Sequence, residues 1–130
     1  MGYETDLKLF IDGVWKSGEG REAHAVVNPV DAQPIAELPY ATQADLDEAL
    51  AASGRAWPEW RSTDVDKRGG ILRKTAKLLR ERADGIAAVM TQEQGKVLAE
   101  SRAEVLASAQ LVDWYAEAIP RGYARLLVGA

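Results

Sequence analysis

The spacing of the apolar residues changes once along this chain of 130 residues, and that change restricts the fold. Up to residue 40, apolar side chains occur in short runs with a period of two, which is typical of β-strands. From Thr42 onward the period becomes that of amphipathic helices, in which every third or fourth residue is apolar. We therefore predict a β arm over residues 1–40, a helical segment over residues 41–120, and the start of a truncated strand over residues 121–130.

The β arm should contain one tight hairpin and two further short strands. Asp12-Gly13 separates the runs Leu7–Ile11 and Val14–Lys16, and an Asp-Gly pair supplies the positive φ angles that a two-residue type I′ turn needs. Ala25–Val27 and Ile35–Leu38 are short apolar runs on either side of a turn signal, an Asn-Pro pair. Each of these runs is expected to form a strand.

The first helix has a marked beginning and a predicted end. Thr42 is a candidate N-cap, and Asp45 lies three residues later in a position like that of a capping box. Pro58 is expected to end this helix near Trp57, because the residue before a proline disfavours the helical conformation. Trp57 and Trp60 form an aromatic junction there, for which we predict packing in a core between helices rather than a ligand platform.

Three further helices are predicted from caps and helix-breaking residues. Asp64 or Asp66 begins the second helix, in which a Gly-Gly pair weakens the first turn. Asp84 is expected to cap a short third helix that stops at Gly95, a good C′ residue. The long fourth helix runs from about residue 97 to residue 118, and a proline ends it. Its apolar stripe consists of Leu98, Val105, Ala109, Val112, Tyr115 and Ile119.

Composition excludes several classes of protein. The net charge of −4 and the pI near 5.0 argue against nucleic acid as a partner, because phosphate binding needs a concentrated basic surface. No apolar run approaches the roughly 20 residues that span a bilayer, and the acidic N-terminus lacks the apolar core of a signal peptide. We therefore expect a cytoplasmic protein with no membrane partner. The chain has no cysteine, which excludes disulfides and a thiolate nucleophile. It has one histidine, His24, so a His-based triad or a metal site with several histidines is poorly supplied.

Three motifs could carry chemistry, and each has a simpler interpretation. Gly18–Ala23 matches the dinucleotide pattern G-x-G-x-x-A by letter, but a strand and a turn follow it, whereas a pyrophosphate site needs a helix there. Glu93, Glu100 and Glu104 are interpreted as parts of solvent-facing helix surfaces and not as a catalytic carboxylate pair. His24 is interpreted as a surface or strand residue. We assign no catalytic and no cofactor-binding residue.

A set of short motifs follows in a characteristic order across residues 7–123. The motifs are Leu9–Trp15, Val27–Pro29, Ala52–Trp60, Thr91–Lys96, Leu98–Glu100, Glu104–Val105 and Asp113–Ala118. In this order and at this spacing, the chain resembles the N-terminal part of the aldehyde dehydrogenase superfamily, most closely its succinate-semialdehyde dehydrogenase-like branch. After residue 123 the chain departs from the family pattern.

The resemblance implies an α/β family fold of which only the N-terminal part is present, mainly α-helical here with a small β arm. Residues 41–120 would be the helical segment of the cofactor-binding domain. Family members oxidise aldehydes to carboxylic acids with NAD or NADP. Their catalytic cysteine, glutamate base, oxyanion-hole asparagine and Rossmann phosphate loop lie further along a chain several times this length, and no position here matches them.

The resemblance therefore implies an N-terminal fragment that is inactive alone and binds no cofactor itself, with NAD or NADP serving the full-length parent. It also carries over a structural cation site, made by the backbone carbonyl of Val27 and the side chain of Glu93. The alternative for Glu93 is a surface residue at a helix end.

Two classes of function remain open. As a fragment, the chain would pair with the rest of the aldehyde dehydrogenase fold or with itself through an exposed apolar helix face. Alternatively, it is a non-catalytic helical interaction module derived from that scaffold, which would use the apolar stripe of the long helix and the edge at Leu126–Val128. A defined monomer or oligomer in light scattering favours the module, whereas aggregation favours the fragment.

Overall fold

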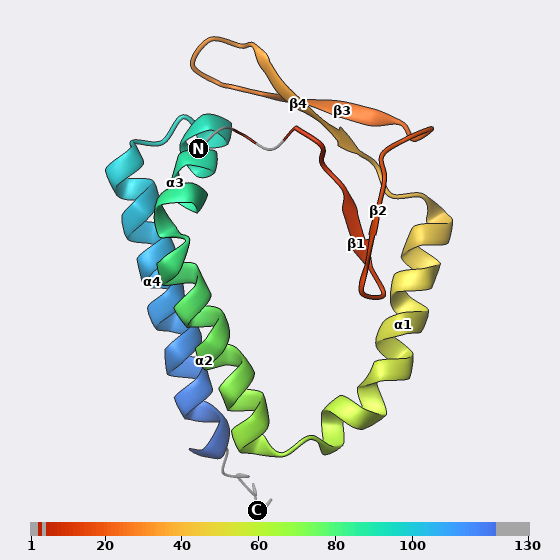
Figure 1. Ribbon diagram of the computed structural model, residues 1–130, viewed down its shortest axis with the longest axis vertical. Coiled ribbons are helices and arrows are strands. Elements are labelled where there is room, and N and C mark those ends of the chain that lie inside the picture. Colours follow the sequence, from red (N-terminus) through yellow and green to blue (C-terminus); the bar gives the residue numbers. More distant parts are fainter. Residues whose placement is uncertain (1–2, 4, 122–130) are drawn as a thin grey trace, which may run out of the picture.

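The computed structural model describes residue 3 and residues 5–121. The strands are β1 (Leu9–Ile11), β2 (Val14–Lys16), β3 (Ala23–Val27) and β4 (Pro34–Pro39). The helices are α1 (Gln43–Ser62), α2 (Val65–Glu81), α3 (Ala83–Gln94) and α4 (Leu98–Ala118), followed by a 3-10 turn at Ile119–Arg121 (Figure 1). This content confirms the prediction of a mainly helical chain with a small β arm. The strand predicted over residues 121–130 lies outside the described residues from position 122 on.

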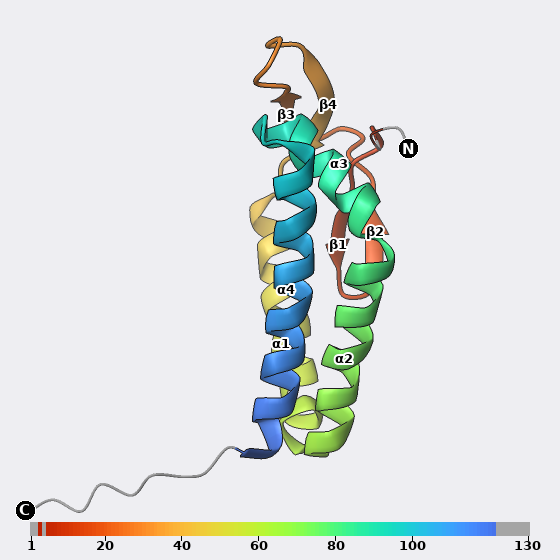
Figure 2. The same cartoon turned by 90° about the vertical axis from the view of Figure 1, so that its left-hand side faces the viewer.

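The elements form two arms that are joined at both ends (Figure 1). α2, α3 and α4 pack together as one arm, in which α4 runs beside α2 in the opposite direction (Figure 2). α1 and the β1–β2 hairpin form the other arm. The β3–β4 hairpin lies across the end of the molecule where α3 also lies. α1 diverges from the other helices, and its main contacts are with β1.

Both hairpins of the β arm have the antiparallel pairing that their sequences favour. Asp12 and Gly13 adopt φ angles of 50° and 79°, which lie in the left-handed region that the Asp-Gly turn requires. β3 pairs with β4 with one irregularity, between Val26 and Val27. The predicted hairpin and the two further strands are confirmed, and β3 and β4 extend a little beyond their predicted ends.

α1 begins as predicted and ends later than predicted. The Thr42 hydroxyl accepts a hydrogen bond from the Asp45 backbone N–H at 3.2 Å, and the Asp45 carboxylate accepts one from the Thr42 backbone N–H at 2.8 Å, which completes the capping box. The predicted end near Trp57 is wrong, because the helix passes through Pro58 and continues to Ser62. Figure 1 shows α1 bending in its C-terminal part, as a proline inside a helix causes.

Side-chain hydroxyls stabilise the last turn of α1 beyond its proline. Pro58 has no N–H, so the helix loses one hydrogen bond of its ladder there. Ser62 Oγ donates to the carbonyl oxygens of Pro58 and Glu59 at 3.1 and 3.0 Å, and Thr63 Oγ1 donates to that of Glu59 at 2.8 Å. These hydroxyls bind carbonyl oxygens of the last turn, where a helix end leaves backbone carbonyls with fewer partners. The bond that the proline removes is the one to the carbonyl four residues earlier, so these hydroxyls support the end of the helix and do not replace that bond.

The two tryptophans of α1 do not form the predicted core. Trp57 is 57% exposed and Trp60 is 43% exposed. The prediction that they pack between helices is wrong for the described part of the chain. The reason is the divergence of α1 from the α2–α4 arm, since no second apolar layer meets the tryptophans within residues 5–121 (Figure 1).

The core lies between α2, α3 and α4 and is built from small residues. Its buried members are Gly69, Ala76, Ala83, Ala87, Ser101, Val105, Ala109 and Ala116. A Cβ at Gly69 would lie 3.4 Å from the carbonyl oxygen of Ala116, which shows how closely α2 approaches the end of α4. Both glycines of the Gly-Gly pair lie within α2, whose N-cap is Asp64, one of the two predicted residues.

Two details predicted for the last helices are wrong. Asp84 is not a cap, because the N-cap position of α3 is Arg82, and Asp84 instead forms a 2.7 Å ion pair with Arg102 of α4. Leu98 and Tyr115 of the predicted apolar stripe are 53% and 55% exposed. Small residues take most of the buried positions of α4, since helices that approach this closely leave little room for large side chains.

Candidate functional site

The glycine-rich segment Gly18–Ala23 forms a turn that leads into a strand. Gly20 has a φ of 73°, and β3 begins at Ala23 directly after the turn. A pyrophosphate site needs the N-terminus of a helix at that point, because the free backbone N–H groups and the helix dipole hold the phosphates. The residues present therefore do not fit a dinucleotide at this motif.

The other candidate residues lie on the surface. His24 is exposed on β3 and stacks on Tyr40, with ring centroids 6.2 Å apart and planes 15° apart. Glu100 and Glu104 are exposed on α4, and Glu104 forms an ion pair with Lys96. The structure does not bring these carboxylates together in a cleft, which is the arrangement that acid–base catalysis by a pair would need.

The segments that contain Val27 and Glu93 lie near each other. The turn after Val27 contacts the end of α3, since a Cβ at Gly95 would lie 3.0 Å from Pro29 Cγ. Glu93 is exposed and accepts a hydrogen bond from the Tyr3 hydroxyl, and burial together with this bond raises the pKa of Tyr3 to about 12. Among residue 3 and residues 5–121, no group of three or more His, Asp or Glu side chains could hold a metal ion. The carried-over cation site at Val27 and Glu93 stays a prediction.

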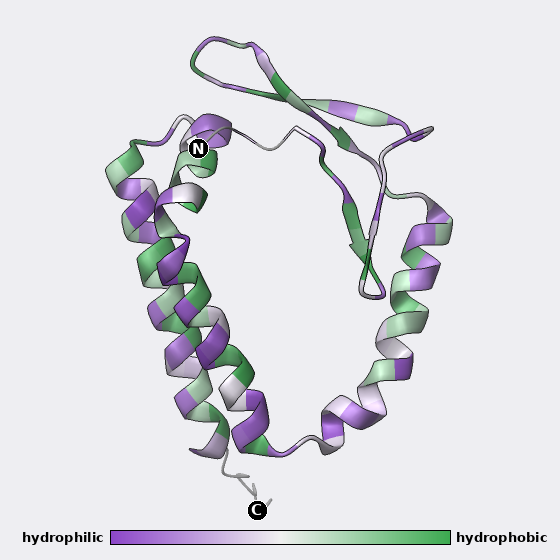
Figure 3. Ribbon diagram, in the orientation of Figure 1, coloured by the Kyte–Doolittle hydropathy of each residue, from purple (hydrophilic) through white to green (hydrophobic). Residues whose placement is uncertain are grey.

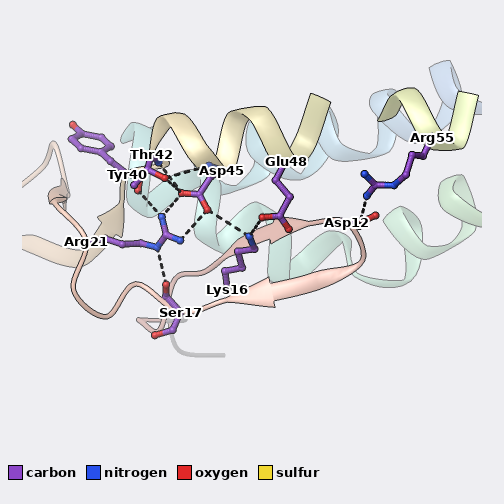
Figure 4. Close-up of polar contacts among 9 residues, drawn as sticks. All are labelled: Asp12, Lys16, Ser17, Arg21, Tyr40, Thr42, Asp45, Glu48 and Arg55. Atoms are coloured by element: carbon purple, nitrogen blue, oxygen red, sulfur yellow. Dashed lines mark hydrogen bonds and ion pairs between the residues drawn. The ribbon is translucent and has the colours of Figure 1, made fainter. Parts of the chain in front are cut away.

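The strongest polar constellation joins α1 to the β arm (Figure 4). We call it the α1 ion-pair cluster; it consists of Lys16, Arg21, Asp45 and Glu48. Arg21 donates to both carboxylate oxygens of Asp45, from Nη1 to Oδ2 at 2.5 Å and from Nη2 to Oδ1 at 3.0 Å. Lys16 Nζ lies 3.7 Å from the second of these oxygens, Oδ1, and forms a closer ion pair with Glu48.

Asp45 is the centre of this cluster and is almost fully enclosed. Its side chain is 6% exposed, and it also accepts hydrogen bonds from the Thr42 backbone N–H and hydroxyl, at 2.8 and 2.6 Å. The Arg21 hydrogen bonds, followed by those from Thr42, hold the pKa of Asp45 well below its ordinary value. A carboxylate with both oxygens engaged and a depressed pKa is a poor general acid or base near neutral pH, so Asp45 has a structural role.

A second ion pair extends the polar contact along α1. Arg55 Nη2 lies 2.8 Å from Asp12 Oδ2, at the tip of the β1–β2 hairpin (Figure 4). The sequence pattern placed Asp45 in a capping box, but no signal in the sequence identified Arg21 as a partner of Asp45 or Arg55 as a partner of Asp12. Their partners lie 24 and 43 positions away along the chain, and only the fold brings them together.

The side of α1 that faces away from these ion pairs is apolar. We call it the α1 apolar face; it consists of Leu46, Leu50, Trp57 and Trp60. Figure 3 shows strongly green, apolar segments along α2 and α4 and paler ones along α1. Leu46 is 51% exposed and Leu50 is 63% exposed. No helix within the described residues is long and apolar enough to cross a membrane.

These features define a scaffold: two hairpins and four helices with a fixed polar joint and a large exposed apolar surface. The chain belongs to the aldehyde dehydrogenase family, whose model matches residues 15–128. This match confirms the resemblance drawn from the ordered motifs. Among the relatives, one curated enzyme is named for NADP(+) and one solved structure is described as NAD-dependent.

Several curated relatives match nearly the whole chain. A 4-(hydroxymethyl)benzenesulfonate dehydrogenase of Comamonas testosteroni is 38% identical over 120 residues, which cover 92% of this chain and 25% of that protein. The NADP(+) succinate-semialdehyde dehydrogenase of Escherichia coli is 34% identical over 130 aligned positions, which cover 96% of this chain and 27% of that protein. The chain thus spans about a quarter of the length of the curated relatives that it matches.

Solved structures of the family have the same arrangement. The lactaldehyde dehydrogenase of Escherichia coli superposes with a TM-score of 0.88 at 30% identity, covering 98% of this chain and 27% of that one. An aldehyde dehydrogenase of Brucella melitensis superposes with a TM-score of 0.85 at 39% identity, covering 89% of this chain and 24% of that one. The two-armed arrangement therefore matches the fold of about a quarter of each of these solved chains.

Proposed function

We propose that this chain is the N-terminal segment of an NAD(P)-dependent aldehyde dehydrogenase that oxidises a semialdehyde to the carboxylic acid. The observation that carries the proposal is the match of nearly the whole chain to about a quarter of each relative. The semialdehyde class is supported by two of the matching relatives, which are named for succinate semialdehyde and glutarate semialdehyde. When bound, the cofactor would supply a hydride acceptor.

The residues of this segment serve the reaction by building the scaffold and not by chemistry. The α1 ion-pair cluster fixes α1 on the β arm, and the small-residue core fixes α2, α3 and α4. The family reaction needs a cysteine thiolate as nucleophile, and this chain has no cysteine. We therefore expect the 130-residue chain to be inactive alone.

An assay of NAD(P)H formation tests the proposal. The purified chain is incubated with succinate semialdehyde and either NAD or NADP, with the Escherichia coli succinate-semialdehyde dehydrogenase as positive control. We expect absorbance at 340 nm to stay at the rate of the blank. A rate above the blank that follows the chain through purification would overturn the proposed inactivity.

A second candidate function is a non-catalytic interaction module on the same scaffold. The observation that favours it is the amount of apolar surface on α1 and α4 that the described residues leave exposed. Light scattering after size exclusion separates the two functions. A monomer or a defined oligomer that unfolds cooperatively favours the module, whereas aggregation of the isolated chain favours the segment of a larger enzyme.

A further inference from the structure

α1 is held on the β arm mainly by charged groups and not by an apolar core. Asp45 is the one buried residue of α1, and Ala49 and Ala52 are half-buried. The other arm differs, because α2, α3 and α4 bury alanines and other small or apolar residues against one another. Most helices in proteins are stabilised by the packing of an apolar face. The position of α1 within this chain therefore depends on its ion pairs.

The ion pairs along α1 become more exposed toward its C-terminal end. At the first turn, the side chains of Arg21 and Asp45 are 17% and 6% exposed. Past the middle of the helix, the side chains of Arg55 and Asp12 are 62% and 51% exposed. Water and salt screen an exposed ion pair strongly and a buried one much less. The two ends of α1 are therefore held with different strengths.

The C-terminal half of α1, residues 53–62, has few other contacts to hold it. Every residue of this half is exposed. Among the residues that the structure describes, the ion pair of Arg55 with Asp12 is the one hydrogen bond or ion pair that joins this half to the β arm or to another helix. Gly54 and Pro58 also lie here, and both residue types weaken a helix. A helical stretch of this length is marginal in water without tertiary contacts.

We propose that the ion pair of Arg55 with Asp12 is a salt-sensitive latch on the C-terminal half of α1. When the latch is closed, residues 53–62 are helical beside the tip of the β1–β2 hairpin (Figure 4). When it is open, the helical hydrogen bonds of this half break, whereas the capping box and the Arg21–Asp45 pair keep the first turns in place. Ionic strength therefore sets the fraction of molecules in which α1 is complete. The latch is made within this chain and does not depend on the proposed function.

Amide hydrogen exchange of the full 130-residue chain tests the latch. Mass spectrometry follows residues 46–52 and 53–62 of α1 separately, with α4 as the reference. Between about 0.01 M and about 1 M NaCl the Debye length falls from about 30 Å to about 3 Å. We expect this change to speed exchange of residues 53–62 about two- to fivefold relative to α4. Residues 46–52 should change by less than about twofold, because the enclosed Arg21–Asp45 pair holds them.

Asp12→Asn opens the latch from the hairpin side, away from the helix whose exchange is measured. Asp12 has a φ of 50°, and asparagine adopts positive φ readily, so the turn is kept. In low salt, Asp12→Asn should speed exchange of residues 53–62 about two- to fivefold and remove most of its response to salt.

Glu37→Gln is the matched control. It removes the same charge from the β arm, at an exposed position of β4 that forms no ion pair within the described residues. We expect it to change neither the exchange of residues 53–62 in low salt nor the response of that exchange to salt. Arg55→Gln then completes a double-mutant cycle, because the two groups act through each other. Added to Asp12→Asn, it should have less effect on exchange than it has alone.

Each other outcome overturns the latch. Equal effects of salt on residues 53–62 and on α4 would show that α1 does not respond separately to ionic strength. Equal effects of Asp12→Asn and Glu37→Gln, or additive effects of Asp12→Asn and Arg55→Gln, would show that the ion pair does not hold the helix. A chain without protected amides in α4 would lack the packed arm from which α1 is distinguished. NAD(P)H formation by the chain would instead refute the proposed inactivity and leave the exchange comparison intact.

Discussion

Gly95 ends α3 in a conformation that only glycine adopts freely, and replacing it should destabilise the chain through two separate effects. Its φ is 69°, and its N–H donates to the carbonyl oxygen of Thr91 at 2.9 Å. Alanine in the left-handed region costs about 1–2 kcal/mol. The new Cβ would also lie 3.0 Å from Pro29 Cγ, so the Asn-Pro turn must move. Pro29 is exposed and can shift, which places this second cost near the lower limit of about 1 kcal/mol for overpacking.

We therefore expect Gly95→Ala to lower the free energy of unfolding by about 2–3 kcal/mol. For a chain of this length the melting temperature falls by about 4 °C per kcal/mol, so a decrease of about 8–12 °C is expected. Circular dichroism at 222 nm during heating measures the shift, and urea unfolding followed by tryptophan fluorescence measures the free energy.

Gly70→Ala is the control for the loss of a glycine in the same helical arm. Gly70 lies inside α2, its φ is not positive, and a Cβ there would meet nothing within 4 Å. We expect this variant to be more stable than the wild type by about 0.5–1 kcal/mol, because alanine favours the helix interior. A melting temperature of Gly95→Ala within about 2 °C of the wild type would refute the reasoning. Pro29→Ala in the Gly95→Ala background should recover the steric part of the loss and leave the conformational part.

Two further predictions concern pH and the ionisable groups at the joints of the fold. Asp45→Asn should lower the midpoint of urea unfolding at pH 7 and make that midpoint less dependent on pH below about 4. The folded-state pKa of Asp45 is depressed, so the ionised carboxylate stabilises the fold fully above the unfolded-state pKa. This stabilisation is lost as the pH falls toward the folded-state pKa. Tyr3→Phe should remove one tyrosine titration near pH 12 from the absorbance at 295 nm, because burial and the hydrogen bond to Glu93 raise the Tyr3 pKa to about 12.

Each of these variants has a matched control in the chain. Asp47→Asn changes an exposed carboxylate on the same helix that lies outside the α1 ion-pair cluster, and it should lower the urea midpoint less than Asp45→Asn does. If Asp45→Asn behaves like Asp47→Asn, the α1 ion-pair cluster does not hold the helix. Tyr115→Phe changes an exposed tyrosine that does not contact Glu93, and it should leave the titration near pH 12 in place. A Tyr3→Phe titration curve that loses amplitude near pH 10 would contradict the assigned environment.

Local backbone chemistry was readable from the residues alone. The Asp12-Gly13 turn, the Thr42–Asp45 capping box and the Gly95 stop each depend on the conformations of a few neighbouring residues, and each is confirmed. The family was readable for a similar reason, because the ordered motifs are largely helix boundaries and turns at fixed spacing. These signals act over three or four positions, so the rest of the fold cannot change them.

Features that depend on contacts between distant parts of the chain are decided by packing and not by local sequence. The sequence predicts that Pro58 ends α1, but the helix continues to Ser62. The sequence also predicts a core position for Trp57, which the divergence of α1 leaves exposed. The pairing of Arg21 with Asp45 joins residues 24 positions apart, and charge types alone do not say which of 16 basic residues a carboxylate will meet. Helical periodicity identified an apolar stripe on α1 but could not say which side of the helix its own chain would cover. The ion pairs with the β arm decide that, because they fix the polar side inward and leave the apolar side exposed.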